Sequence, residues 1–145
     1  MEGVTRYGSG VRLRTSGGKY PDQVVTGYPY KFDNAIAGKT GTTQNQSDGW
    51  FIGLVPNLST GIWVGAEDRS VHFVDITRGQ GASMALPIWA LYMQRNYANE
   101  DLEISKEDFE KPENLTISVD CDLERDKDDQ EKDQKKPDLN DEIDF

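Results

Sequence analysis

The sequence Gly-Lys-Thr-Gly-Thr-Thr, from Gly38 to Thr43, holds the residues of this chain that are best suited to chemistry. Lysine supplies a cation, threonines supply hydroxyl groups, and glycines let another molecule approach the backbone closely. Two kinds of site contain Gly-Lys-Thr: a loop that cradles the phosphates of a nucleotide, and a strand that forms one wall of an acyl-transfer site.

The phosphate-binding loop needs a glycine five residues before Gly38, and Asp33 stands at that position. A carboxylate there would repel a phosphate. The helix that should follow Lys39 is also replaced by Gly41 and two β-branched threonines, which favour extended backbone. We therefore do not expect a nucleotide site.

An extended strand allows a different chemistry, because a peptide can lie alongside it as an added strand. The period of two in a strand puts the side chains of Thr40 and Thr42 on the same side. Gly41 leaves out a side chain that would obstruct the approach of a substrate. The alternative for so short a motif is an exposed edge strand with a lysine that has no special role.

The segments that must position this strand show the features of a β-hairpin. We expect strands at 35–43, 49–55 and 60–66, and the turn-forming residues 56–59 separate the last two, which should pair antiparallel. In the second strand Trp50 and Ile52 alternate with Phe51 and Val55, so both faces of the sheet need a cover.

Only one strong helix is available to cover the sheet. Ser83 can act as its N-cap, with Pro87 in its first turn and its end at Tyr97. One helix leaves a sheet face and a strand edge without a partner. We therefore expect an α+β fold, an antiparallel sheet packed with helices, that is an incomplete portion of a larger domain.

The charge of the chain is distributed unevenly. The 145 residues carry a net charge of −10, but residues 99–145 carry −12 and residues 1–98 carry +2. All fourteen glycines lie in residues 1–98, which we expect to form the folded portion. Residues 99–121 should be an extension with a possible short strand at Leu115–Val119, and residues 122–145 a disordered acidic tail.

Several kinds of site are excluded by composition. The only cysteine is Cys121 and the only histidine is His72, so neither an intramolecular disulfide nor a thiolate or histidine metal site is expected. We expect no metal, no cofactor and no nucleic-acid partner. The chain contains no apolar run of membrane-spanning length and does not start with a signal sequence, so we expect no membrane anchor or export signal in it.

Longer stretches around Lys39 carry a resemblance. They are residues 37–45, the Asp-Gly-Trp-Phe-Ile-Gly of 48–53, Pro56-Asn57, the Thr-Gly-Ile-Trp-Val-Gly of 60–65, Gly81, the Leu-Pro-Ile-Trp of 86–89, and upstream 1–4 and Gly8-Ser9-Gly10. Together they closely resemble the last part of the transpeptidase domain of class A penicillin-binding proteins, with Ser9 in place of the usual threonine of the upstream turn. The resemblance covers residues 1–98, with the segment 109–119 as an extension.

The resemblance implies a function for the parent protein. Such enzymes attack the D-Ala-D-Ala end of a peptidoglycan stem peptide with a serine and pass the acyl group to an amine, and beta-lactams acylate the same serine. Lys39, Thr40 and Gly41 would belong to the catalytic site. The hydroxyls of Thr40 and Thr42 would bind the substrate carboxylate, and the Thr42 N–H would donate to the oxyanion, a contribution of about 3 kcal/mol.

The same family implies partners and a place of action. The partners are the stem peptide, beta-lactams and the remainder of the transpeptidase domain, in a protein that also carries a glycosyltransferase domain. Such a protein works at the cell membrane on its periplasmic or extracytoplasmic face, held by an N-terminal anchor that this chain lacks.

Two elements of the catalytic machinery have no credible match in this chain. Ser16-Gly-Gly-Lys19 fits the Ser-x-x-Lys pattern, but two glycines disfavour the required helix, and Ser16 lies only 23 residues before Lys39. No Ser-x-Asn occurs. We therefore expect the chain to be inactive alone. The alternative is a noncatalytic β-rich module that binds peptide or glycan.

Overall fold

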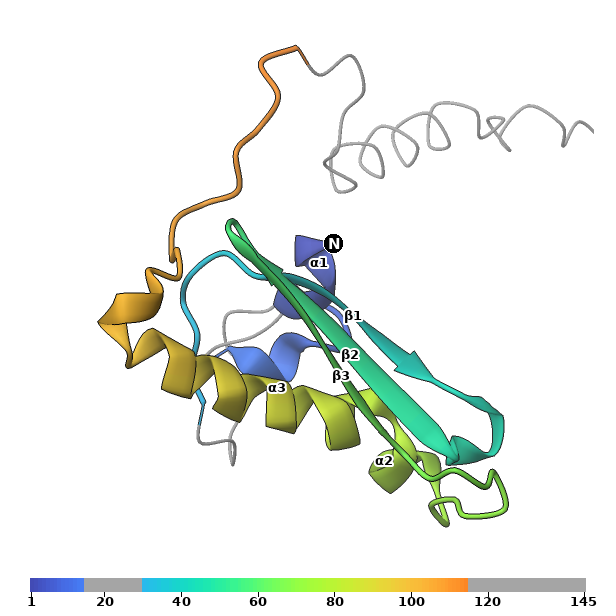
Figure 1. Cartoon of the computed structure of the whole chain (residues 1–145). Helices are drawn as coiled ribbons and strands as arrows, with labels where there is room; N and C mark the ends of the chain where they lie inside the picture. Colours follow the sequence, from blue (N-terminus) through green and yellow to red (C-terminus); the bar gives the residue numbers. More distant parts are fainter. Residues whose placement is uncertain (15–29, 115–145) are drawn as a thin grey trace, which may run out of the picture. The chain divides into compact units, whose positions relative to one another are not determined.

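An antiparallel sheet of three strands forms the framework of the computed structural model, which describes residues 1–14 and 30–114 (Figure 1). The strands are β1 (Ala37–Thr42), β2 (Asp48–Val55) and β3 (Leu58–Gly65), in the order β1-β2-β3. The expected α+β class, the three strands and the antiparallel hairpin are confirmed. Leu115–Val119, the acidic tail and Ser16–Lys19 lie outside the described residues.

The turn between β2 and β3 is tighter than the sequence indicated. Val55 pairs with Leu58, so the turn consists of Pro56 and Asn57 alone. Two-residue turns are the commonest hairpin connections because their twist matches that of the strands. Asn57 also holds the chain that follows the last helix, since its side-chain amide donates to Glu103 O (2.8 Å) and its Oδ1 accepts from Ser105 N (2.9 Å).

Helix α3 (Gly81–Tyr97) covers one face of the sheet (Figure 1). Trp89 is fully buried, packs edge-on against Phe51 of β2, and donates its indole N–H to the Thr60 hydroxyl of β3 (2.6 Å). The core around this contact consists of Leu13, Tyr30, Phe32, Ile36, Phe51, Val55, Ala85, Leu86, Trp89, Ala90 and Met93. Burying these side chains on one side of the sheet is the main source of its stability.

The start of α3 differs from the prediction that Ser83 is its N-cap. The N-cap is Gln80, and Ser83 lies inside the helix and donates its hydroxyl to Thr77 O (2.7 Å). Pro87 is consequently the seventh helical residue rather than a residue of the first turn. Helix α3 has no side-chain cap. The short helix that precedes it, α2 (Ile76–Gly79), is capped by Asp75, whose side chain accepts from Arg78 N (2.9 Å).

Two glycines let α3 approach the sheet closely. A Cβ atom on Gly53 would lie 2.3 Å from the indole of Trp89. A Cβ atom on Gly81 would lie 2.4 Å from the carbonyl oxygens of both Gly41 and Trp50. The first residue of α3 therefore rests directly on the backbone of β1 and β2.

The remaining elements are short. They are α1 (Glu2–Arg6), three 3-10 turns η1 (Val11–Leu13), η2 (Gln44–Gln46) and η3 (Glu100–Leu102), and the loop between β3 and α2. The chain divides into two compact units, Met1–Glu110 and Lys111–Phe145, and all of these elements belong to the first. That unit includes the residues that follow α3 as far as Glu110.

Candidate functional site

Strand β1 lies at an edge of the sheet, with β2 on one side. Gly38 N–H donates to Met1 O (3.3 Å) of the segment that starts α1, whereas Thr43 N–H, just after the strand, donates to Asp48 O (3.1 Å) of β2. The backbone groups of successive strand residues alternate between the two sides. The N–H and C=O groups of Thr40 and Thr42 therefore face away from β2, where an added strand would pair.

Lys39 and Gly41 lie on the sheet face opposite α3. They pair directly with Ile52 and Trp50 of β2, and directly paired residues share a face. The Lys39 ammonium donates to Thr40 O (2.6 Å), so the cation lies against the outer edge of the strand. A Cβ atom on Gly41 would lie 3.2 Å from Cβ of Trp50, so the glycine leaves room for that side chain.

Thr40 and Thr42 lie on the other face, as the period of two predicted. The Thr42 hydroxyl accepts from Gly81 N (3.0 Å) at the start of α3, which ties the end of β1 to the helix. The Thr40 hydroxyl lies 2.6 Å from the hydroxyl of Ser9, in the turn after α1. The strand thus presents hydroxyls on one face, and on its outer edge the Lys39 ammonium together with peptide groups that do not pair with β2.

The face that carries Lys39 is apolar and open. Trp50, Trp63 and Ile52 remain 46%, 47% and 43% exposed on it, although they are large hydrophobic side chains. Among the described residues nothing comparable to α3 covers this face. The expectation that a single helix leaves one sheet face without a cover is therefore confirmed.

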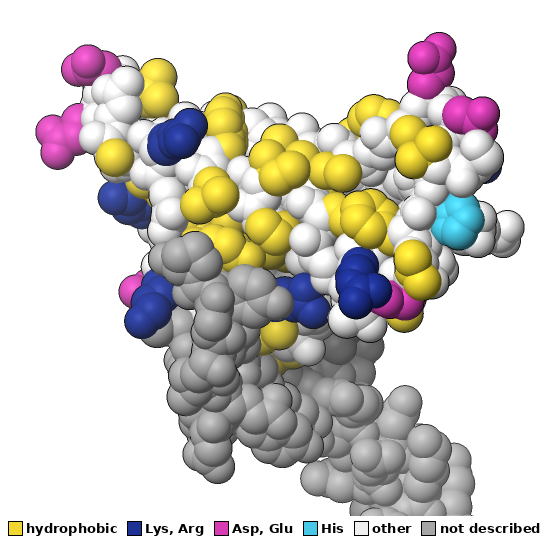
Figure 2. All heavy atoms as spheres, turned by 90° about the horizontal axis from the view of Figure 1, so that it is seen from below, with side chains coloured by type: hydrophobic (Ala, Val, Ile, Leu, Met, Phe, Trp, Pro, Cys, Tyr) yellow, Lys and Arg dark blue, Asp and Glu magenta, His cyan; other side chains and the backbone are white. Residues whose placement is uncertain are grey.

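The outer side of α3 is apolar too. Ile88, Leu91 and Tyr92 are about half exposed. Figure 2, which views the molecule from below, shows hydrophobic side chains spread along this side with few charges among them.

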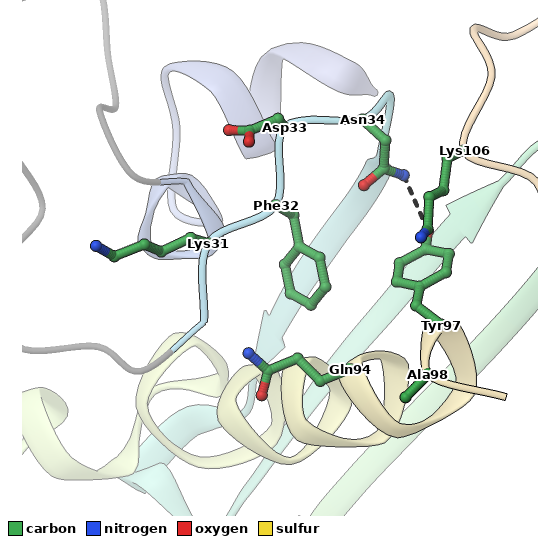
Figure 3. Close-up of a pocket in the computed structure, with 8 residues that line it drawn as sticks. All are labelled: Lys31, Phe32, Asp33, Asn34, Gln94, Tyr97, Ala98 and Lys106. Carbon is green, nitrogen blue, oxygen red and sulfur yellow. Dashed lines mark hydrogen bonds between the residues drawn. The ribbon is translucent and has the colours of Figure 1, made fainter.

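A cavity of about 450 Å³ lies between the segment before β1 and the end of α3 (Figure 3). Asn34 donates to the Tyr97 hydroxyl (2.9 Å), and the Lys106 ammonium lies 5.0 Å from the centre of the Tyr97 ring. Burial raises the pKa of the Tyr97 phenol, and the hydrogen bond from Asn34 opposes that shift in part. No residue of β1 lines this cavity, so it is separate from the candidate site.

A second cavity, of about 330 Å³, lies beyond the β1–β2 turn and is lined by Ser47, Val64, Gly65, Ala66, Val71, His72 and Phe73. Nδ1 of His72 lies 2.9 Å from the carbonyl oxygen of Phe73, and the ring is exposed. Within residues 1–14 and 30–114, no group of three metal-ligating side chains comes together. In the same ranges, no helix has the length and apolar character needed to cross a membrane.

The structure thus brings together the residues predicted from the motif and adds one that the motif does not contain. Lys39, Thr40, Gly41 and Thr42 form a continuous segment of an edge strand. Ser9 joins them from 31 residues upstream. The only sequence signal for Ser9 was its place in the Gly8-Ser9-Gly10 turn, which says nothing about its partner.

Comparison with known proteins relates the sequence to penicillin-binding proteins. It is 39% identical over 90 residues to penicillin-binding protein 1A of Aquifex aeolicus, which is 60% of this chain and 11% of that protein. It is 37% identical over 97 residues to penicillin-binding protein 1A of Clostridium tetani, 67% of this chain and 12% of the relative. The match to the Pseudomonas aeruginosa protein of the same name is 43% over 58 residues, 40% of this chain and 7% of the relative.

The relatives that carry these matches are all penicillin-binding protein 1A, so the chain has partial homology to that protein. It spans about a tenth of the length of the first two relatives. No protein-family model matches the sequence. No solved structure shows a significant match either.

Proposed function

We propose that this chain supplies the substrate-binding wall of a peptidoglycan D,D-transpeptidase, in which Lys39, Thr40, Gly41 and Thr42 act on D-Ala-D-Ala stem peptides. The observation that carries the proposal is the outer edge of β1, where the peptide groups of Thr40 and Thr42 face away from β2 and the Lys39 ammonium lies against Thr40 O. The partial homology to penicillin-binding protein 1A supports it.

Each group on the strand has a role in this reaction. An acyl-peptide pairs with the edge of β1 as an added strand, which aligns its scissile bond along the strand. The Thr42 N–H, which faces outward, donates to the tetrahedral oxyanion, a contribution of about 3 kcal/mol. The Lys39 cation and the Thr40 and Thr42 hydroxyls bind the substrate carboxylate. Hydrogen bonds to a charged acceptor are stronger than those to a neutral one.

The nucleophile belongs to the remainder of the transpeptidase domain, which we propose as the structural partner of this chain. The open face with Trp50, Ile52 and Trp63 is the surface on which that remainder packs. A contiguous exposed patch of large apolar side chains usually marks an interaction site. In the parent protein the reaction takes place on the outer side of the cell membrane.

A chimera tests this proposal. Residues 1–98 replace the homologous segment of the Aquifex aeolicus penicillin-binding protein 1A, and acylation is followed with a fluorescent penicillin. We expect the chimera to be labelled, and Lys39→Ala to slow acylation at least tenfold, because the carboxylate and the reacting serine lose their cation. The matched control is Lys31→Ala, which removes an exposed lysine outside β1.

Two results would contradict the proposal. An unlabelled but folded chimera, with binding of stem peptide retained, would favour the noncatalytic module that binds peptide or glycan. Equal losses of acylation and thermal stability in Lys39→Ala would make the lysine structural.

A further inference from the structure

We propose that Ser9 is a positioning residue of the carboxylate-binding site, which acts by orienting the hydroxyl of Thr40. This inference rests on the proposed function, since it assigns a task to a residue beside the same strand. The observation behind it is the 2.6 Å separation of the two hydroxyl oxygens, from segments 31 residues apart.

The turn that carries Ser9 is fixed to the end of α1. Gly10 N–H donates to Val4 O (2.9 Å), and Val11 N–H donates to Gly8 O (3.1 Å). A Cβ atom on Gly8 would lie 3.0 Å from Cα of Val4, so the turn lies directly against the helix backbone. Ser9 therefore has little freedom to move relative to α1.

Helix α1 is in turn fixed to the start of β1. The fully buried Thr5 hydroxyl lies within hydrogen-bond distance of Ile36 O, the last residue but one before Gly38. Gly38 N–H donates to Met1 O at the other end of the helix. Two contacts therefore set the position of α1 along the strand, and with it the position of the Ser9 hydroxyl beside Thr40.

The hydrogen bond between the Ser9 and Thr40 hydroxyls can orient the Thr40 proton. The proton of a lone threonine hydroxyl can point in several directions, and an exposed hydroxyl donates its hydrogen bond to water. When Ser9 donates to Thr40, the Thr40 oxygen is occupied as an acceptor and its proton is free for the substrate carboxylate. A hydroxyl that accepts one hydrogen bond also becomes a stronger donor in the next. Thr40 is thereby prepared for an anion before the substrate arrives.

The contact with Thr40 needs only a hydroxyl, so serine can replace the threonine that is usual at position 9. The hydroxyl pair is exposed, so a substrate can reach it without any rearrangement. Serine and threonine place the same oxygen on Cβ, so either can donate to Thr40. Alanine keeps the turn but removes the donor.

The test compares two penicillins on the chimera described above: one with its free carboxylate and one in which the carboxylate is a methyl ester. Binding before acylation and the acylation step are separated by measuring labelling rates over a range of concentrations. We expect Ser9→Ala to weaken binding of the free acid five- to tenfold and to change binding of the ester less than twofold. The rate of the acylation step should stay within twofold, and Ser9→Thr should restore the binding.

A double-mutant cycle with Thr40→Ala isolates the coupling. Because Ser9 acts through Thr40, the double variant should lose no more binding of the free acid than Thr40→Ala alone. If Ser9→Ala does not fold, Ser9→Cys keeps the size of the side chain with a weaker donor, and an acid-specific loss of binding is expected there.

The outcomes separate this inference from the proposed function. If the unsubstituted chimera is labelled but Ser9→Ala loses binding of acid and ester equally, or of neither, Ser9 is a structural residue of the turn and the inference is wrong. Additive losses in the double variant would also overturn it. An unlabelled chimera would overturn the proposed function, and the role of Ser9 with it.

Discussion

The contact of Gly81 with the backbone of β1 and β2 leads to a prediction in which two effects oppose each other. Gly81→Ala places a methyl group 2.4 Å from the carbonyl oxygens of Gly41 and Trp50, well inside van der Waals contact. Those atoms belong to two strands of the sheet, so no side-chain rotation can relieve the clash. Overpacking of this kind costs about 1–3 kcal/mol, and backbone obstacles on two sides place it near 3.

The opposing effect is helix propensity. Alanine is favoured over glycine by at most about 1 kcal/mol in a helix, and by less at the first helical residue. The net expectation is a loss of about 2 kcal/mol of unfolding free energy. For a domain of about 150–250 residues this corresponds to a fall in Tm of roughly 4–8 °C.

The assay is thermal unfolding of the chimera, with Gly3→Ala as the matched control. Gly3 lies in α1, and a Cβ atom there would meet nothing within 4 Å, so only the propensity effect remains and Tm should stay constant or rise slightly. Gly81→Ala should also slow acylation, because Gly81 N anchors the Thr42 hydroxyl. If Gly81→Ala matches Gly3→Ala in Tm, the helix moves away from the sheet at no cost, and the reasoning from close contact is refuted.

Two further predictions concern the chain as a whole. The 145-residue chain alone should not be labelled covalently by a fluorescent beta-lactam. Its only Ser-x-x-Lys match is Ser16-Gly-Gly-Lys19, in which two glycines disfavour the helix that the nucleophile needs. Labelling of Ser16, located by mass spectrometry, would contradict this prediction. Burial raises the pKa of Tyr97 above 10.0, so the folded state holds that proton more tightly than the unfolded state does. The free energy of unfolding should therefore fall as the pH rises above 10, and Tyr97→Phe should lessen that fall. Denaturant unfolding below and above pH 10 measures this free energy. An unchanged pH dependence in the variant would assign the effect to other groups.

The sheet could be predicted from sequence because its signals are local. Alternation at Trp50 and Phe51 and the turn residues at Pro56 and Asn57 gave the hairpin within a few residues. The start of α3 could not be read in the same way. Glycine is a poor helix former, so Gly81 did not look like the first residue of a helix, and Ser83 looked like a cap. Close packing on the sheet overrides that preference, since only glycine fits where α3 meets β1 and β2.

The candidate site was predictable only in part, for the same reason. Lys39, Thr40, Gly41 and Thr42 are contiguous, so their arrangement follows from strand geometry alone. The partner of Thr40 comes from a turn 31 residues upstream, and no local pattern shows which turn meets which strand. The clamp of Asn57 on Glu103 and Ser105 was equally invisible, because it depends on where the chain returns after α3.

Lys39 lies on the same sheet face as Trp50 and Trp63, so under the proposed function catalysis depends on how this face is packed. Whatever packs on the two tryptophans also approaches the lysine, so under the proposed function the surface that contacts the rest of the domain borders the groups that would act on the substrate. A substitution that weakens this packing far from the strand would lower activity without touching a reacting atom. Under the proposed function, packing of the rest of the domain on this face and formation of a competent active site would be a single event.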